Sequence, residues 1–129
     1  MPTLKRPVAY FNKEDFTLDG NLVLKLRDKP RFVLFQANGC YHCDQVKPHF
    51  QRLANGLATE GKIECLTIVA DGDTHDDREI ARKIPRIYRK IEGYPSFLLF
   101  IKGERIPYTG ERTVEAFKEF LKKAVETHK

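Results

Sequence analysis

At 129 residues, the chain has the length of one domain, which we expect to extend over residues 1–129 with its core over about 30–125. Hydrophobic residues make up 41% of it and charged residues 32%, as in soluble globular proteins, and no apolar run approaches the roughly 18 residues of a membrane span. The net charge of +5 favours acidic partners, whereas three cysteines are too few for a disulfide scaffold.

The first half of the chain predicts one clear strand and one clear helix, after a less regular start. Asn12–Phe16 resembles a short capped helix, Asp19–Asn21 is a turn signal, and Leu22–Leu26 fits either a strand or a helix. Arg31–Gln36 is a nearly continuous apolar run bounded by breakers, which predicts a buried central strand. Over Tyr41–Leu57, apolar residues recur every three or four positions, which predicts a helix.

The second half of the chain predicts further alternation of strands and helices. In order, the expected elements are a strand at Ile63–Val69, helices at Asp76–Pro85 and Pro85–Ile91, a hairpin of Ser96–Ile101 and Arg105–Tyr108 around Lys102–Glu104, and a helix from Val114 to Val125. Alternating elements imply right-handed parallel crossovers, and the hairpin adds an antiparallel portion. We therefore expect an α/β fold, with a central mixed β-sheet flanked by helices on both faces.

Basic residues are densest in the segment 82–90. We interpret this segment as a solvated helix face and expect no nucleic-acid partner, because no aromatic stacking platform or nucleic-acid module accompanies it. The residues concerned are Arg82, Lys83, Arg86, Arg89 and Lys90.

Two of the cysteines, Cys40 and Cys43, lie at the predicted junction of a buried strand and a helix. The unpaired amide groups at a helix start stabilise an anion, so the pKa of the Cys40 thiol should fall below its free value. Cys43, one helical turn further in, should reach Cys40 but be more shielded. This arrangement predicts that Cys40 attacks a substrate disulfide and that Cys43 then resolves the mixed disulfide.

His42 lies between the two cysteines, where an imidazolium would favour the thiolate and make the pair a stronger oxidant. An exposed histidine without a role is the alternative. A zinc site is a second alternative for the cysteines, although the sequence offers no second close ligand pair. A purely structural disulfide across so short a loop would constrain little of the unfolded chain.

Three separated motifs in the right order give the chain a resemblance to the thioredoxin superfamily. The first is Phe32–Pro48, with Cys-x-x-Cys and a proline five residues later; the second is Gly93–Phe97, followed by a hairpin at Phe100–Glu104. The third, Tyr108–Thr113, resembles a segment of catalytic protein disulfide isomerase domains. The resemblance covers roughly 32–123 and implies a thioredoxin-like fold, closest in motifs to an isomerase-type domain.

The resemblance also implies roles for individual residues. Cys40 would be the nucleophile and Cys43 the resolving thiol, Pro95 would be cis, and the backbone of Tyr94 would pair with the bound substrate chain. Arg112 resembles the mobile arginine that tunes the resolving cysteine in isomerases, with a surface salt bridge as the alternative. We count Tyr41, which replaces the usual glycine or proline, among the residues that bind substrate.

The sequence departs from the family pattern at several positions. Leu34 occupies the place of a buried acid that is thought to shuttle protons to the resolving cysteine, and Gly39 replaces the usual tryptophan. Asp44 replaces a common lysine, and its charge should oppose thiolate formation. The segment Arg82–Glu92 is longer than the family norm. Cys65, in a predicted strand, is expected to be a buried free cysteine.

The function that follows is thiol–disulfide exchange with protein substrates, leaning towards oxidation or isomerisation. A cytosolic disulfide reductase and a thioredoxin-like binding module with low turnover are the alternatives. We expect no cofactor beyond a redox-active Cys40–Cys43 disulfide, an unidentified redox partner, and a monomer. The N-terminus lacks the apolar core of a secretory signal, so we expect a cytoplasmic protein, with a virus particle or a processed secretory form as alternatives.

Overall fold

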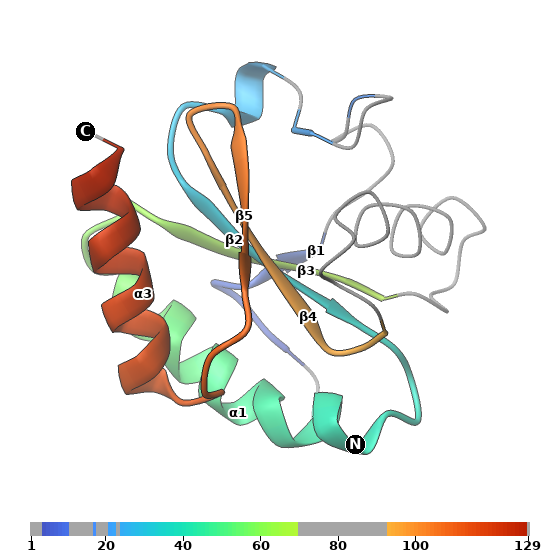
Figure 1. Cartoon of the computed structure of the whole chain (residues 1–129). Helices are drawn as coiled ribbons and strands as arrows, with labels where there is room; N and C mark the ends of the chain where they lie inside the picture. Colours follow the sequence, from blue (N-terminus) through green and yellow to red (C-terminus); the bar gives the residue numbers. More distant parts are fainter. Residues whose placement is uncertain (1–3, 11–16, 18–20, 23, 70–92, 129) are drawn as a thin grey trace.

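A computed structural model of the chain describes residues 4–10, 17, 21–22, 24–69 and 93–128. The described strands form one mixed sheet in the order β1-β3-β2-β4-β5, in which β3 runs parallel to β1 and β2, while β4 is antiparallel to β2 and β5 (Figure 1). The elements are β1 (Ala9–Tyr10), the short 3-10 helix η2 (Leu24–Leu26), β2 (Arg31–Gln36), α1 (Tyr41–Leu57), β3 (Glu64–Val69), β4 (Ser96–Ile101), β5 (Glu104–Tyr108) and α3 (Val114–Thr127).

The predicted α/β fold with a central mixed sheet is therefore confirmed. Both α1 and α3 cover the same face of the sheet (Figure 1). The helices expected at Asn12–Phe16, Asp76–Pro85 and Pro85–Ile91, and with them the basic segment 82–90, lie outside the described residues. No helix in the described ranges is long and apolar enough to cross a membrane.

The central strand β2 is buried along its whole length, which explains why its four middle residues are all apolar. Because side chains alternate across a strand, Phe32 and Leu34 face the two helices, whereas Val33 and Phe35 face the opposite side. Gln36, the last residue of the strand, shares the face of Leu34 and lies where the chain leaves the sheet to begin α1. The strand therefore delivers Cys40 to the start of that helix.

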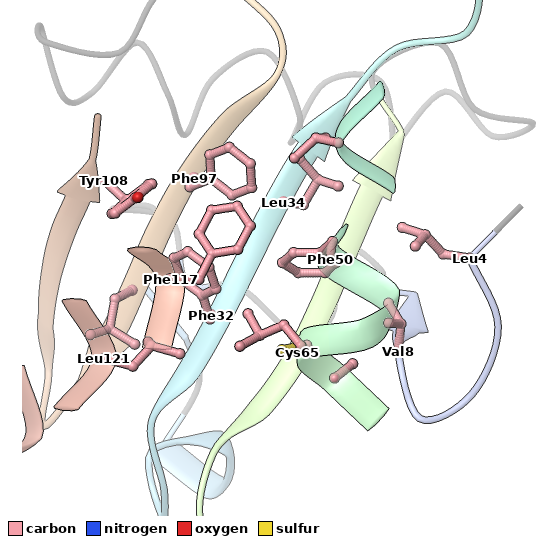
Figure 2. Close-up of a cluster of buried hydrophobic side chains, with 14 of the residues drawn as sticks. Leu4, Val8, Phe32, Leu34, Phe50, Cys65, Phe97, Tyr108, Phe117 and Leu121 are labelled. Atoms are coloured by element: carbon pink, nitrogen blue, oxygen red, sulfur yellow. The ribbon is translucent and has the colours of Figure 1, made fainter. Parts of the chain in front are cut away.

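Aromatic side chains fill the core between the sheet and the helices. The Phe32 ring lies 5.6–6.0 Å, between centroids, from five other aromatic rings, which belong to Phe50, Phe97, Tyr108, Phe117 and Phe120. Figure 2 shows Phe32 beside Phe97 and Phe117, with Phe50 above β3. Such offset and edge-on pairs add to the stabilisation that burial of the rings gives.

The start of the described chain differs from expectation in two ways. The two-residue strand β1 pairs with β3 and was not predicted, because two residues carry no detectable periodicity. Leu22–Leu26, which the sequence left undecided, begins with a buried Leu22 in an isolated bridge and continues as η2. The segment before β1 packs on α1, because the Lys5 amide donates a hydrogen bond to the Gln51 side-chain oxygen at 2.7 Å.

The predicted hairpin of β4 and β5 is confirmed, with a turn one residue shorter than expected. Lys102 and Gly103 both adopt positive φ, at 46° and 80°, which is the geometry of a two-residue hairpin turn, and Glu104 already belongs to β5. Pro107 lies in β5, opposite Leu98 of β4. A proline is tolerated there because β5 is the edge strand of the sheet.

Candidate active site

Cys40 occupies the capping position of α1, as the sequence predicted. Its backbone is extended, with φ −93° and ψ 110°, and its side chain accepts a hydrogen bond from the Cys43 amide, with the nitrogen 3.2 Å from the sulfur. The sulfur therefore takes the place of the oxygen that usually caps a helix. An amide that donates to sulfur stabilises the thiolate more than the neutral thiol, because the bond to an anion is stronger.

Cys40 and Cys43 form a disulfide, and their Cα atoms are 5.2 Å apart. The two residues differ in exposure: Cys40 is partly accessible, whereas the exposed fraction of Cys43 is 0%. The expected shielding of Cys43 is thus confirmed. A thiol from another molecule can approach this disulfide only from the Cys40 side.

The loop before β4 faces Cys40. The Tyr94–Pro95 peptide bond is cis, as the family resemblance implied, and the Tyr94 carbonyl oxygen lies 3.8 Å from the Cys40 sulfur. Inside the loop, the Ser96 hydroxyl donates to the Gly93 carbonyl at 2.6 Å, and Gly93 has the positive φ of 78° that favours glycine. The structure therefore brings together both cysteines and the loop that was predicted to bind substrate.

Tyr41 and His42 lie on the outer side of the first turn of α1. Tyr41 is 70% exposed, and His42 is also exposed. Their rings meet edge to face, with centroids 5.5 Å apart, and the Tyr41 hydroxyl accepts a hydrogen bond from the Gln45 side-chain amide at 2.9 Å. An ordered, exposed aromatic ring next to Cys40 is available to contact an incoming polypeptide.

Arg112 is exposed in the segment between β5 and α3. Among the described residues, no hydrogen bond or ion pair links its side chain to Cys40 or Cys43. The segment itself is held close to β5, since the Tyr108 hydroxyl donates to the Glu111 carbonyl. Gly110 fits against the same tyrosine: a Cβ atom there would lie 2.8 Å from its hydroxyl oxygen. A tuning role for Arg112 stays a prediction.

Beneath the first turn of α1 the sheet offers neutral groups. Leu34 is completely buried, and its register partner on β3 is Thr67. The buried Gln36 side-chain amide donates to the Thr67 hydroxyl at 2.8 Å, and this hydroxyl donates to the Leu34 carbonyl at 2.8 Å. Sequence reasoning missed this pair, although a polar residue ending an apolar strand four positions before Cys40 was a usable signal.

The charge of Asp44, which the sequence predicts to oppose thiolate formation, is partly compensated in the fold. Its carboxylate forms an ion pair with Lys47 at 3.0 Å, and the Lys47 side chain is only 8% exposed. The ion pair offsets the repulsion that Asp44 alone would exert on a thiolate. Lys47 was also missed from the sequence, where it reads as one more polar helix residue.

Cys65 is a buried free cysteine, as expected. It lies in β3 at 2% exposure, and burial, with a smaller contribution from Glu64, raises the pKa of its thiol from 9.0 to about 12. Figure 2 shows it below Phe50 in the core between β3 and α1. A neutral, buried thiol is a poor nucleophile.

The raised pKa of Cys65 predicts a loss of stability at high pH. Between pH 9 and pH 12 the unfolded thiol is ionised while the folded thiol keeps its proton, so the free energy of unfolding falls as the pH rises. At pH 10 the loss should be about 1.4 kcal/mol relative to neutral pH. Urea unfolding of the protein and of Cys65→Ala at both pH values checks this.

Cys65→Ala is the matched control for this comparison, because Tyr10 and Tyr108, whose pKa values are also raised, titrate in both proteins. The pH-dependent loss should therefore be smaller in the variant by the share that Cys65 contributes. An equal loss in both proteins would contradict the assignment.

Comparison with known proteins gives the chain its family. The family model for thioredoxin matches residues 8–123. The chain belongs to the thioredoxin family. With the Cys40–Cys43 disulfide at a helix start, this thioredoxin-family domain has the centre of a thiol–disulfide oxidoreductase.

Two curated relatives of this thioredoxin-family domain are informative. Thioredoxin-like protein 453L of Invertebrate iridescent virus 6 is 31% identical over 116 residues, which are 82% of this chain and 84% of that protein. Protein disulfide-isomerase tigA of Aspergillus niger is 32% identical over 104 residues, which are 79% of this chain but 27% of the isomerase. The domain thus spans most of the viral protein and about a quarter of the fungal one.

Among solved structures, the crystal structure of the J-Trx1 fragment of ERdj5 has a TM-score of 0.69 to this thioredoxin-family domain. The two are 22% identical, and the match covers 92% of this chain and 52% of that fragment. This likeness supports the fold. In the described ranges of the domain, no three His, Cys, Asp or Glu side chains are grouped as metal ligands.

Proposed function

We propose that this domain oxidises and isomerises disulfides in protein substrates, with Cys40 as the nucleophile and Cys43 as the resolving thiol. The observation that carries the proposal is the pair at the start of α1: one partly accessible sulfur that accepts an amide hydrogen bond, and one fully buried partner. The isomerase-named relative supports substrates that are proteins.

In the oxidising direction, a substrate thiolate attacks Cys40 and the Cys40–Cys43 bond breaks, so Cys43 leaves as a thiolate. A second substrate thiolate then attacks the substrate sulfur of the mixed disulfide and releases Cys40 with its electron pair. The substrate loses two electrons and the pair gains them, and an external acceptor must reoxidise the pair. In isomerisation, the Cys40 thiolate attacks a substrate disulfide and is released when another substrate thiol displaces it.

Substrate binding is assigned to the surface around Cys40. In the Tyr94–Pro95 loop, the Tyr94 carbonyl oxygen lies 3.8 Å from the Cys40 sulfur. This oxygen can accept a hydrogen bond from a backbone amide of an extended substrate chain. Tyr41, which follows Cys40 in the chain, adds an exposed aromatic ring to this surface. His42, next to it, supplies a positive charge when protonated, which favours the reduced pair and hence oxidation of the substrate.

The reduction potential of the Cys40–Cys43 pair tests the direction of exchange. Equilibration with glutathione buffers should give a value close to the roughly −180 mV of protein disulfide isomerase, and His42→Ala should make it more negative. A value close to the roughly −270 mV of thioredoxin would reject the oxidant and favour a disulfide reductase. The rate at which the protein reactivates scrambled ribonuclease should fall when the reduction potential becomes more negative, as in His42→Ala.

A binding module with low turnover is a second candidate, favoured by the burial of Leu34 where a carboxylate would serve proton transfer. Reduction of insulin by the domain, coupled to excess dithiol, distinguishes the two candidates. Rapid turnover rejects the binding module, whereas capture of mixed disulfides without turnover would favour it.

A further inference from the structure

In the described part of the chain, the end of the sheet that leads to the cysteines is neutral. On the face of β2 and β3 that meets α1, this end carries Leu34, Gln36 and Thr67, none of which is charged. The N-terminal segment contributes the apolar Leu4 and Val8 to the same core, as Figure 2 shows. The described residues of this face and of the N-terminal segment therefore place no charge in the core beside the start of α1.

Lys47 is the charged residue that the fold buries at this place. Among the described residues only Arg31 and Lys47 are both charged and buried, and Arg31 lies at the opposite end of β2. Arg31 and Gln36 are five residue steps apart along the strand, which corresponds to about 17 Å. A lysine with an exposed side-chain fraction of 8% is uncommon without a partner, and Asp44 is one partner here.

The ion pair fixes where the ammonium group lies. Lys47 follows Cys43 by four residues, so their Cβ atoms are neighbours on one helix face, about 5–6 Å apart. Helical side chains lean towards the N-terminus. The 3.0 Å distance from the Lys47 Nζ to the Asp44 carboxylate shows that this ammonium returns to the first turn, which contains both cysteines.

We propose that Lys47 is a positioning residue that holds the resolving sulfur as a thiolate. Leu34 occupies the place of the family's proton-accepting carboxylate, and Lys47 assists the resolving cysteine in its absence. This inference rests on the proposed function. Once the Cys43 thiol has lost its proton, the ammonium stabilises the anion that remains. Asp44 fixes the ammonium and offsets part of its charge.

The step concerned is the release of the mixed disulfide. The Cys43 thiolate attacks the Cys40 sulfur, the Cys40–Cys43 bond forms, and the bond from Cys40 to the substrate sulfur breaks. The substrate sulfur leaves as a thiolate with the electron pair. The other titratable groups at this helix start are Cys40, Tyr41 and His42, so the test must separate the reactivity of Cys43 from theirs.

A chromogenic aromatic disulfide, dithiobis(nitrobenzoate), separates the two cysteines in a stopped-flow experiment with reduced protein. The first phase is attack of Cys40 on the reagent and releases one coloured thiolate. The second phase is attack of Cys43 on Cys40 and releases the other, at a rate that does not depend on reagent concentration. Lys47→Met should slow the second phase about tenfold at pH 7 and raise the pH of its half-maximal rate by about one unit.

Asp44→Asn is the decisive second variant, because it keeps the ammonium but removes the Asp44 charge that offsets it. It should accelerate the second phase and lower the pH of half-maximal rate. A purely structural role for the pair would move both variants in the same direction. Lys123→Met, which removes an exposed ammonium paired with Glu119 at 3.3 Å on α3, is the matched control and should leave both phases unchanged.

Equal rates in Lys47→Met and the unmodified protein, or shifts of the same sign in both variants, would overturn the inference while the proposed function stands. Absence of a second phase in the unmodified protein would overturn both. The equilibrium constant with glutathione provides an independent measurement. Disulfide formation should become more favourable in Lys47→Met and less favourable in Asp44→Asn, by about tenfold or ~30 mV each.

Discussion

Replacing Cys40 by serine is expected to lower disulfide exchange by about three orders of magnitude or more, the effect seen when a catalytic nucleophile is removed. A serine hydroxyl keeps the capping hydrogen bond but is neither ionised at neutral pH nor able to form a disulfide. Thermal unfolding of reduced protein should therefore change little while turnover in the insulin assay disappears.

Cys43→Ser should act differently, because it leaves Cys40 able to attack but removes the thiol that resolves the product. Mixed disulfides through Cys40 should accumulate and be visible on non-reducing gels. Cys65→Ser is the control, since a buried neutral thiol takes no part in exchange. Retained turnover in Cys40→Ser, or trapping through Cys65, would contradict the assigned roles.

Replacing Phe32 by alanine should produce the largest loss of stability of the substitutions considered. Its ring is completely buried on β2 and contacts five other aromatic rings, so the truncation leaves a cavity that rigid neighbours cannot fill. The free energy of unfolding should fall by about 3–5 kcal/mol, measured by urea denaturation of the oxidised protein.

Leu24→Ala provides the comparison, because its side chain is 79% exposed on η2. The same measurement should give a change within about 0.5 kcal/mol. A loss of less than about 1 kcal/mol for Phe32→Ala would mean that the helices repack over the sheet and that the aromatic cluster is not the main core.

The elements with strong periodicity could be predicted from sequence, and those without it could not. Residues 32–35 are all apolar because the central strand is buried on both faces, and the sequence contains that information directly. In contrast, Ala9–Tyr10 becomes a strand because β3 offers it an edge, a tertiary cause that no local pattern records.

The residues of the candidate site also fall into those that the sequence reveals and those that only the fold reveals. Cys40, Cys43 and Pro95 were found from spacing and motif, and their arrangement is confirmed. Lys47 and Gln36 were not found from the sequence, because it is their burial in the fold, and not their residue type, that sets them apart. A lysine in a helix is ordinarily solvated, and only packing reveals that this one is buried and paired with Asp44.

Pro107 has a consequence for how other polypeptides reach this molecule. It sits in the outermost strand β5, and a proline cannot donate a main-chain hydrogen bond. A foreign strand that tried to extend the sheet along β5 would meet a gap in the donor row, which discourages edge-to-edge association. Pro107 thus makes β5 a poor template for a further strand and protects this edge of the sheet.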